Sequence, residues 1–229
     1  MINDLFVFDF DDTLATTVAN IGVARTHNGK NDKMFRSWLL EHDLYPVDEK
    51  TTNQLTYFYL PSDDFAKYQK FASDYITEET VDHFDFADTA KVDAGVTKQN
   101  KAIITVLKQA ESLPNSRVII VTARATDEMD TPFGAVPATN REDIENFLQG
   151  IGSSVNQSQI FPVGSSNPAD KATIVRKYIE SLNPKTVHFY DDNELNLEAI
   201  QQLCDEFNGV PNIITHKVSD GVPEPGVEC

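Results

Sequence analysis

Three carboxylates follow an apolar run near the start of the chain. Residues Leu5 to Phe8 are all apolar, and Asp9, Asp11 and Asp12 come soon after them. A continuous run of this kind is typical of a strand buried on both faces, and we expect it to end at Asp9. Open α/β sheets bind ligands at the carboxyl ends of their strands. There, Asp9 and Asp11 can converge on one phosphoryl group, one as a nucleophile and the other as a proton carrier.

Crowded carboxylates also favour a bound cation. An unpaired buried charge is costly, and oxygen ligands suit the hard divalent ion Mg²⁺. The structural alternative is an acidic turn in which Asp12 and Thr13 cap a following helix. The elements that follow must therefore supply the other groups of a site if the chemical interpretation holds.

The composition limits the classes of partner. The net charge of the 229 residues is −17, and the sequence has no cluster of Lys or Arg. Such a surface repels anionic membranes and extended nucleic acid. A phosphorylated strand end could still enter a metal-neutralised site. The hydrophobic content of 40% is enough to form a buried core.

The cysteines and the absence of leader signals bear on the compartment. Cys204 and Cys229 are the only two cysteines, which is no disulfide framework and favours a reducing compartment. We expect Cys204 to lie in the core and Cys229 to be exposed. Asp4 and Asp9 argue against a signal peptide, and no apolar run reaches membrane-spanning length. These features predict a soluble, cytoplasmic protein.

Helix and strand patterns alternate from Val96 onward. We expect strands at 118–122, 159–163, 186–190 and 212–218, and helices at 97–110, 140–150, 167–179 and 197–207. The composition of residues 125–139 is typical of a loop, and we expect the tail at 221–226 to be loosely packed. The alternation predicts an α/β protein with a doubly wound (Rossmann-like) parallel sheet and right-handed crossovers.

An insertion interrupts this alternation. Residues 15–29 form a mixed polar stretch, and residues 32–44 show a helical pattern that Pro46 ends. The aromatic segment 55–60 is a short strand or a buried loop, and a helix with Phe65, Tyr68, Phe71 and Tyr75 follows it. These aromatic residues either form the insertion's own core or line a pocket that stacks on a base or sugar. We therefore divide the chain into a core of residues 1–14 and 93–229 and an insertion at 15–92.

Four motifs in the same order carry a resemblance to a known family. Asp9, Asp11 and Thr13 form Asp-x-Asp-x-Thr after a hydrophobic strand, which resembles the first motif of the haloacid dehalogenase (HAD) superfamily. Its other three motifs are matched in order, each at a strand end or helix start, by Thr122, Lys171 and Asp191-Asp192. The resemblance spans nearly the whole chain outside the insertion.

The resemblance implies a phosphomonoesterase mechanism. Asp9 would attack phosphorus and form an aspartyl-phosphate, and Asp11 would protonate the leaving oxygen and later deprotonate water. Dehalogenases lack an acid at the position of Asp11, so dehalogenation is disfavoured. The resemblance further implies that Mg²⁺ is held by the Asp9 side chain, the Asp11 backbone carbonyl and Asp191. Thr122 would donate to a phosphoryl oxygen, and Lys171 would neutralise the nucleophile and the phosphate.

Several contributions stay open. Asp192, Glu194 and Asn196 are all candidates to complete the metal shell, and Asp192 either binds a metal-bound water or pairs with Lys171. Thr13 is expected to orient the loop after Asp9. Arg124 either binds a second anion of the substrate or is an ordinary solvated arginine.

The substrate class follows from the resemblance only in outline. The insertion occupies the position of a type 1 cap, so we expect a small phosphorylated metabolite or nucleotide as substrate. Thr122-Ala123-Arg124 and Tyr190-Asp191-Asp192 also resemble, more loosely, the superfamily's nucleotidases and polynucleotide 3′-end phosphatases. The alternatives are a phosphotransferase or mutase and a non-enzymatic binding module on a HAD scaffold. Neither substrate identity nor oligomeric state follows from the sequence.

Overall fold

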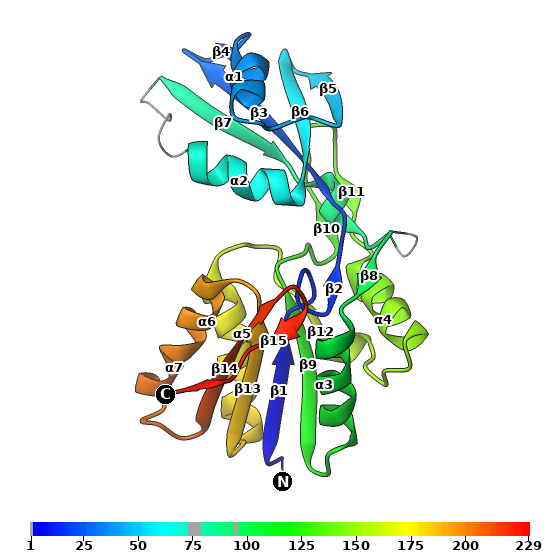
Figure 1. Cartoon of the computed structure of the whole chain (residues 1–229), viewed down its shortest axis with the longest axis vertical. Coiled ribbons are helices and arrows are strands. Elements are labelled where there is room, and N and C mark those ends of the chain that lie inside the picture. The colour runs from blue at the N-terminus through cyan, green and yellow to red at the C-terminus, as the bar shows by residue number, and fades with distance from the viewer. Residues whose placement is uncertain (1, 73–78, 94–95) are drawn as a thin grey trace. The chain divides into compact units, whose positions relative to one another are not determined.

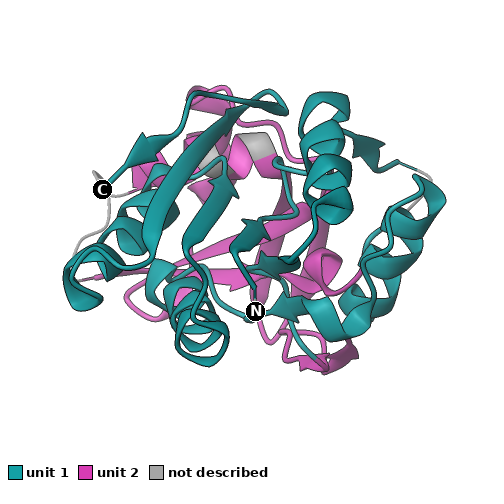
Figure 2. Cartoon of the chain, turned by 90° about the horizontal axis from the view of Figure 1, so that it is seen from below, with its two compact units in different colours: residues 1–17, 92–126, 139–229 teal, residues 18–91, 127–138 magenta. Residues whose placement is uncertain are grey.

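The structure, a computed structural model, describes residues 2–72, 79–93 and 96–229 (Figure 1). It forms two compact units (Figure 2): unit 1 is Met1–Thr17, Val92–Thr126 and Thr139–Cys229, and unit 2 is Val18–Lys91 and Asp127–Ala138. The segment 127–138, which we expected to be a loop of the α/β core, groups with unit 2. Its strands β10 (Glu128–Met129) and β11 (Val136–Pro137) pair with each other in antiparallel fashion.

Unit 1 is built on a mostly parallel sheet, which confirms the predicted α/β class. The strand order is β12-β9-β1-β13-β14-β15. The central strand β1 (Asp4–Phe8) pairs in parallel with β9 (Ser116–Thr122) and β13 (Thr186–Asp191). Outside them, β12 (Ile160–Pro162) pairs in parallel with β9, and β14 (Asn212–Ser219) pairs in parallel with β13.

Side-chain alternation explains why helices cover both faces of this sheet. Phe6 and Phe8 belong to one buried cluster, and Leu5 and Val7 belong to another. Since successive side chains of a strand point to opposite faces, both faces of β1 need an apolar cover. The first cluster includes residues of α3 (Lys101–Ser112) and α4 (Asn140–Gly150). The second includes residues of α5 (Pro168–Leu182), α6 (Glu194–Gln201) and α7 (Leu203–Glu206).

Local sequence signals predicted the start of helix α5 closely and the start of helix α3 less closely. Asn167 is the N-cap of α5, its side chain accepts a hydrogen bond from the Ala169 backbone N–H at 3.1 Å, and Pro168 is the first helical residue. Helix α3 begins later than expected, because β8 (Lys98–Gln99) pairs with β2 (Ala15–Thr16) before it. The expected helix at 197–207 is two helices, α6 and α7. The 3-10 turns η1 (Ala87–Ala90) and η2 (Gln157–Gln159) complete the helical elements that the structure describes.

The C-terminal tail is ordered. Cys204 is buried and Cys229 is exposed, as we expected, but our expectation that they form no disulfide is wrong. Strands β15 (Val222–Pro223) and β16 (Val227–Glu228) both pair in antiparallel fashion with β14. The tail therefore returns toward α7, where Cys229 and Cys204 form a disulfide with Cα atoms 6.3 Å apart. Unpaired cysteines were our argument for a reducing compartment, and that argument fails. No helix in the described part of the chain is long and apolar enough to cross a membrane.

Unit 2 contains an antiparallel sheet of order β4-β3-β6-β5, with β7 on the other side of β3. The strands are β3 (Asn20–His27), β4 (Lys30–Asn31), β5 (Asp48–Thr52), β6 (Leu55–Pro61) and β7 (Thr80–Asp85), and the helices are α1 (Phe35–Glu41) and α2 (Ser62–Ala72). The stretch 15–29, which we described only as mixed and polar, holds β3. The charged Arg25 hid the strand in the sequence, because a charged side chain is usually exposed. In the structure Arg25 is buried, and its Nε pairs with Asp82 Oδ1 at 2.8 Å.

The aromatic residues of unit 2 form a core of their own. Phe35 contacts Phe58 and Tyr68 edge to face, with ring centroids 6.0 Å apart in both pairs. Phe65 joins the same buried cluster. These four residues therefore follow the first of our two interpretations. Tyr75 lies outside the described residues.

Candidate active site

The parallel register of three neighbouring strands brings the expected residues to one edge of the sheet of unit 1. Phe8 of β1 is opposite Ile120 of β9 and Tyr190 of β13. The next residue, Asp9, continues the pairing, since its backbone N–H donates to the Tyr190 carbonyl at 2.9 Å. Thr122 and Asp191 are the last residues of β9 and β13. The carboxyl ends of the three strands thus hold the groups that the sequence singled out.

Lys171 links the first and fourth motifs. It lies near the start of α5, and its Nζ donates to Asp9 Oδ1 at 2.6 Å and to Asp191 Oδ2 at 2.8 Å. All three side chains are buried, with at most 6% of each exposed. The lysine therefore bridges two buried carboxylates.

The residues after Asp191 have distinct positions. Asp191 Oδ1 accepts hydrogen bonds from the Asn193 backbone N–H and from Asn196 Nδ2, both at 2.9 Å. Asn196 therefore holds Asp191. Glu194 is exposed and pairs with Lys217 instead. Of our three open candidates, Asp192 is the one that lies with the other carboxylates.

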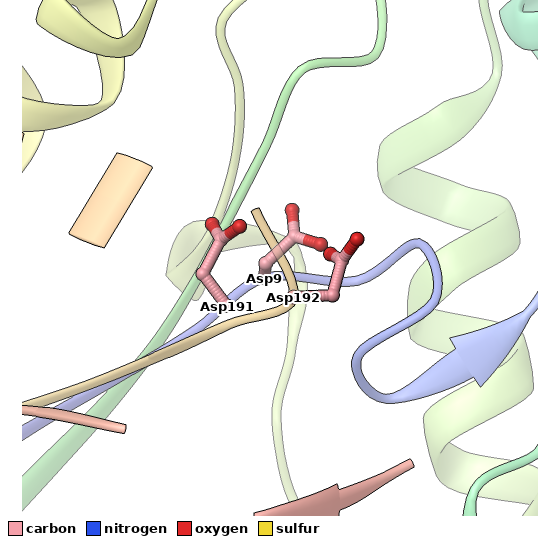
Figure 3. Close-up of side chains that lie close together, drawn as sticks. All are labelled: Asp9, Asp191 and Asp192. Atoms are coloured by element: carbon pink, nitrogen blue, oxygen red, sulfur yellow. The ribbon is translucent and has the colours of Figure 1, made fainter. Parts of the chain in front are cut away.

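Three carboxylates form a group that could hold a cation (Figure 3). One oxygen each of Asp9, Asp191 and Asp192 lies within 4.8 Å of the others. Thr13 Oγ1 donates to Asp192 Oδ1 at 3.4 Å, a long contact that ties the first motif to the fourth. An all-oxygen, all-carboxylate donor set fits Mg²⁺, which prefers hard oxygen ligands.

The electrostatics of this group also favour a cation. Burial raises the pKa of Asp9 well above its usual range; the charge of Lys171 opposes this rise, and the Asp191 and Asp192 carboxylates add to it. Burial, with the nearby Asp191 charge, raises the pKa of Asp192 to about 6. Burial alone would lower the pKa of Lys171, but the two carboxylates that it contacts raise it. One ammonium group thus faces several crowded carboxylates, and a divalent cation would relieve their repulsion.

Asp11 has surroundings quite different from those of Asp9. Thr17 Oγ1 donates to its Oδ1 at 2.6 Å, and Thr122 Oγ1 donates to its Oδ2 at 3.2 Å. Arg124 Nη2 donates to Oδ1 at 2.7 Å, and Arg124 Nε donates to Oδ2 at 2.9 Å. Burial raises the pKa of Asp11, but the charge and hydrogen bonds of Arg124 outweigh it, so the pKa is lowered.

Arg124 and Asn140 differ from our expectations. Arg124 is buried, so the solvated alternative is wrong, and its guanidinium contacts the Asp11 carboxylate. An Asn at the start of the predicted helix 140–150 indicates an N-cap, but Asn140 is fully buried and Thr139 occupies that position. Asn140 Oδ1 accepts from Arg124 Nη1 at 3.2 Å. Sequence reasoning missed this residue as part of the site, since an Asn before a helical pattern indicates a cap.

No family model matches the sequence, and no curated protein matches it. Among solved structures, the chain is similar to the HAD domain of effector protein Lem4 from Legionella pneumophila, with a TM-score of 0.40 and 12% identity over 96% of this chain and 88% of that one. The structure of an inactive mutant of that domain gives a TM-score of 0.41 with the same identity and coverage. A functional assignment therefore rests on the residues of this chain.

Proposed function

We propose that the chain is a Mg²⁺-dependent phosphomonoester hydrolase of the HAD type that works through an aspartyl-phosphate. The observation that carries the proposal is the convergence of Asp9, Lys171, Asp191 and Asp192 at the carboxyl edge of a parallel sheet. Asp11, two residues after Asp9, is the proton carrier. A nucleophile, a fixed cation, a carboxylate set for a metal and an acid/base group are the parts that such a reaction needs.

Asp9, Asp191 and the Asp11 backbone carbonyl would hold Mg²⁺, with Asp192 completing the carboxylate set. The bound ion would supply positive charge that screens the repulsion between an anionic nucleophile and an anionic phosphate. Lys171 adds a second positive charge beside Asp9 from a buried, fixed position. Thr122, the last residue of β9, donates its hydroxyl to Asp11 Oδ2 and would also donate to a phosphoryl oxygen.

In the first step, a carboxylate oxygen of Asp9 forms a bond to phosphorus while the bond between phosphorus and the alcohol oxygen breaks. The electron pair of the broken bond stays on the alcohol oxygen, which takes the proton of Asp11 and leaves as the alcohol. The products of this step are an aspartyl-phosphate and ionised Asp11.

In the second step, a water oxygen forms a bond to phosphorus, and Asp11 takes one proton from that water. The bond between phosphorus and the Asp9 oxygen breaks, and its electron pair returns to the Asp9 carboxylate. Inorganic phosphate leaves, and Asp9 and protonated Asp11 are restored. Each turnover thus converts one phosphomonoester and one water to one alcohol and one phosphate.

We also propose that unit 2 is the cap that selects the substrate. Its main segment, Val18–Lys91, follows β1 and precedes β9 in the chain, between the first two motifs. Caps of this kind select substrate and exclude water during phosphoryl transfer. A small phosphorylated metabolite or nucleotide suits a chain with a net charge of −17 better than extended nucleic acid does.

The test is phosphate release from a panel of monoesters, with and without Mg²⁺, by the wild type and by Asp9→Asn. The panel holds nucleoside 5′- and 3′-monophosphates, sugar phosphates and a 3′-phosphorylated oligonucleotide. Asp205→Asn, an exposed carboxylate of α7, is the matched control. We expect release that needs both Mg²⁺ and Asp9 and that is retained in the control. Release that only an added acceptor alcohol accelerates would indicate a phosphotransferase, and no release by folded wild type would reject the hydrolase.

A further inference from the structure

The loop between β1 and β2 carries two residues of the candidate site, Asp11 and Thr13. Within this loop Asp12 has a φ of +58°, in the left-handed region that residues other than glycine rarely adopt. The Asp12 backbone N–H donates to the Ala15 carbonyl at 2.7 Å, and the Ala15 backbone N–H donates to the Phe10 carbonyl at 3.0 Å. Two backbone hydrogen bonds therefore close a tight turn directly beside the site.

Asn100, far along the chain, binds three consecutive carbonyls of this loop. Its Nδ2 donates to the Thr13 carbonyl at 2.8 Å and to the Asp12 carbonyl at 3.2 Å. Its backbone N–H donates to the Leu14 carbonyl at 3.0 Å. Its remaining side-chain atom, Oδ1, accepts from Thr16 Oγ1 at 3.0 Å. One residue thus ties the whole segment 12–14 to the start of helix α3.

The helix that Asn100 precedes does not explain its amide. Asn100 is the N-cap residue of α3, yet its side chain makes no capping hydrogen bond. An asparagine at this position usually turns its side-chain oxygen to the first N–H groups of the helix. Here that oxygen meets the Thr16 hydroxyl, and the NH₂ group meets the loop. The side chain therefore serves the loop, and an aspartate would supply the oxygen but no N–H donor.

A second turn holds Asn100 from another side. Gly221 lies between β14 and β15 with a φ of +73°, and a Cβ atom added to it would lie 2.5 Å from the Cβ atom of Asn100. The Gly221 carbonyl accepts from the Ile103 backbone N–H at 3.3 Å, which packs this turn on the first turn of α3. Close packing of this kind restricts the rotation of the Asn100 side chain.

We propose that Asn100 is a positioning residue: its amide holds the backbone of Asp12 and Thr13, and so fixes where the side chains of Asp11 and Thr13 lie. The inference rests on the proposed function, in which Asp11 carries protons. Asn100 acts through the loop and has no need to touch the substrate. A left-handed residue such as Asp12 keeps its conformation only when surrounding contacts hold it. A reacting group displaced by about 1 Å costs on the order of a hundredfold in rate.

The experiment compares the wild type with Asn100→Asp and Asn100→Ala. Asn100→Asp keeps the shape of the side chain and the oxygen that Thr16 contacts, but it loses the donor to the loop. Asn100→Ala removes the amide without adding a charge. Gln99→Glu, at an exposed position of β8, adds the same charge one residue earlier and is the matched control.

Two quantities are measured for each protein. The first is kcat and KM with Mg²⁺, for the monoester that the wild type hydrolyses fastest. The second is amide hydrogen exchange in EDTA, read by mass spectrometry for peptides that cover residues 9–15 and the strands β9 and β13. Exchange in one peptide reports the opening of that segment, whereas a general loss of stability speeds exchange throughout unit 1.

We expect both Asn100 variants to lose about tenfold to a hundredfold in kcat, with KM within about threefold of the wild type. Exchange should become about tenfold faster in the peptide 9–15 and stay unchanged in β9 and β13. Gln99→Glu should match the wild type in both measurements.

Three results would overturn the inference. The first is wild-type kcat and exchange in both variants. The second is a loss confined to Asn100→Asp, which would assign the effect to the added charge. The third is faster exchange throughout unit 1, or failure of both variants to fold, which would assign Asn100 to general stability. No hydrolysis by the wild type would instead reject the proposed function, and the exchange rates would still show whether Asn100 holds the loop.

Discussion

The ammonium group of Lys171 lies 2.6 Å from the Asp9 carboxylate, although 162 residues separate the two in the chain. Both side chains are buried at the carboxyl edge of the parallel sheet of unit 1. The residue that we propose as nucleophile is therefore paired with a fixed cation before a substrate arrives. Because this pairing joins the first strand to helix α5, it should affect the stability of unit 1 as well as its chemistry.

Lys171→Met should destabilise the protein strongly. Loss of the ammonium group leaves the buried Asp9 and Asp191 carboxylates without their partner, and breaking a buried pair in this way costs about 3 to 5 kcal/mol. Urea unfolding in EDTA measures the change in the free energy of unfolding. Lys177→Met, an exposed lysine of the same helix, should stay within about 0.5 kcal/mol of the wild type. Equal losses in the two variants would contradict a buried pair at Lys171.

Asp192→Asn should make the metal-free protein more stable at neutral pH. Burial raises the pKa of Asp192 to about 6, above the value of about 3.9 in an unfolded chain. The folded protein thus binds this proton more tightly, and the free energy of unfolding falls as the pH rises from about 4 to about 6. An asparagine has no such proton to lose.

Thermal or urea unfolding in EDTA at pH 4 and pH 7 tests this expectation. At pH 7 the variant should exceed the wild type by about 1 to 2 kcal/mol, and near pH 4 the difference should vanish. Saturating Mg²⁺ should stabilise the wild type more than the variant, because the proposed Mg²⁺ site includes the Asp192 carboxylate. A variant that is less stable than the wild type at pH 7 without metal would speak against the assigned environment.

Loss of the Cys204–Cys229 disulfide should weaken unit 1. The two cysteines are 25 residues apart, and a loop of this length corresponds to about 3 kcal/mol of stabilisation. Cys229→Ser should lower the free energy of unfolding by about that amount in the absence of reductant. Reductant should lower the stability of the wild type to a similar level and leave the variant unchanged. Two reactive thiols in the denatured, unreduced wild type would show that the bond does not form.

Asp82→Asn should destabilise unit 2. Asp82 accepts from Arg25 Nε at 2.8 Å, and both side chains are 5% exposed. The guanidinium of Arg25 also lies over the Phe35 and Trp38 rings. The neutral amide would leave this buried cation without its carboxylate, at a cost of about 3 kcal/mol or more.

Trp38 is the only tryptophan of the chain, so its fluorescence reports on unit 2. In Asp82→Asn, the fluorescence transition should move to a lower denaturant concentration than in the wild type. Asp48→Asn, whose carboxylate is exposed, should leave the transition in place. An unshifted transition in Asp82→Asn would mean that the ion pair adds nothing to unit 2.

The sequence by itself determined the elements whose signals lie within a few adjacent residues. The apolar run that ends at Asp9 indicated a strand buried on both faces, since the period of a strand is local. Asn167 and Pro168 indicated the start of α5, because a cap and a first-turn proline act on neighbouring backbone groups. Once these elements alternate, a parallel sheet follows, and the residues at its strand ends are expected at one edge.

Only the tertiary structure decided which distant groups meet. Arg25 of β3 is buried because it pairs with Asp82 of the neighbouring strand β7. Cys229 lies near Cys204 because the tail pairs with β14. Asn140 contacts Arg124 because α4 starts beside the end of β9. These pairings depend on the order of the strands and on the path of the loops. Neither can be predicted from the hydrophobic periodicity of one segment or from the residues that cap one helix. The side-chain environment of Asp11 therefore became visible only when the chain was folded.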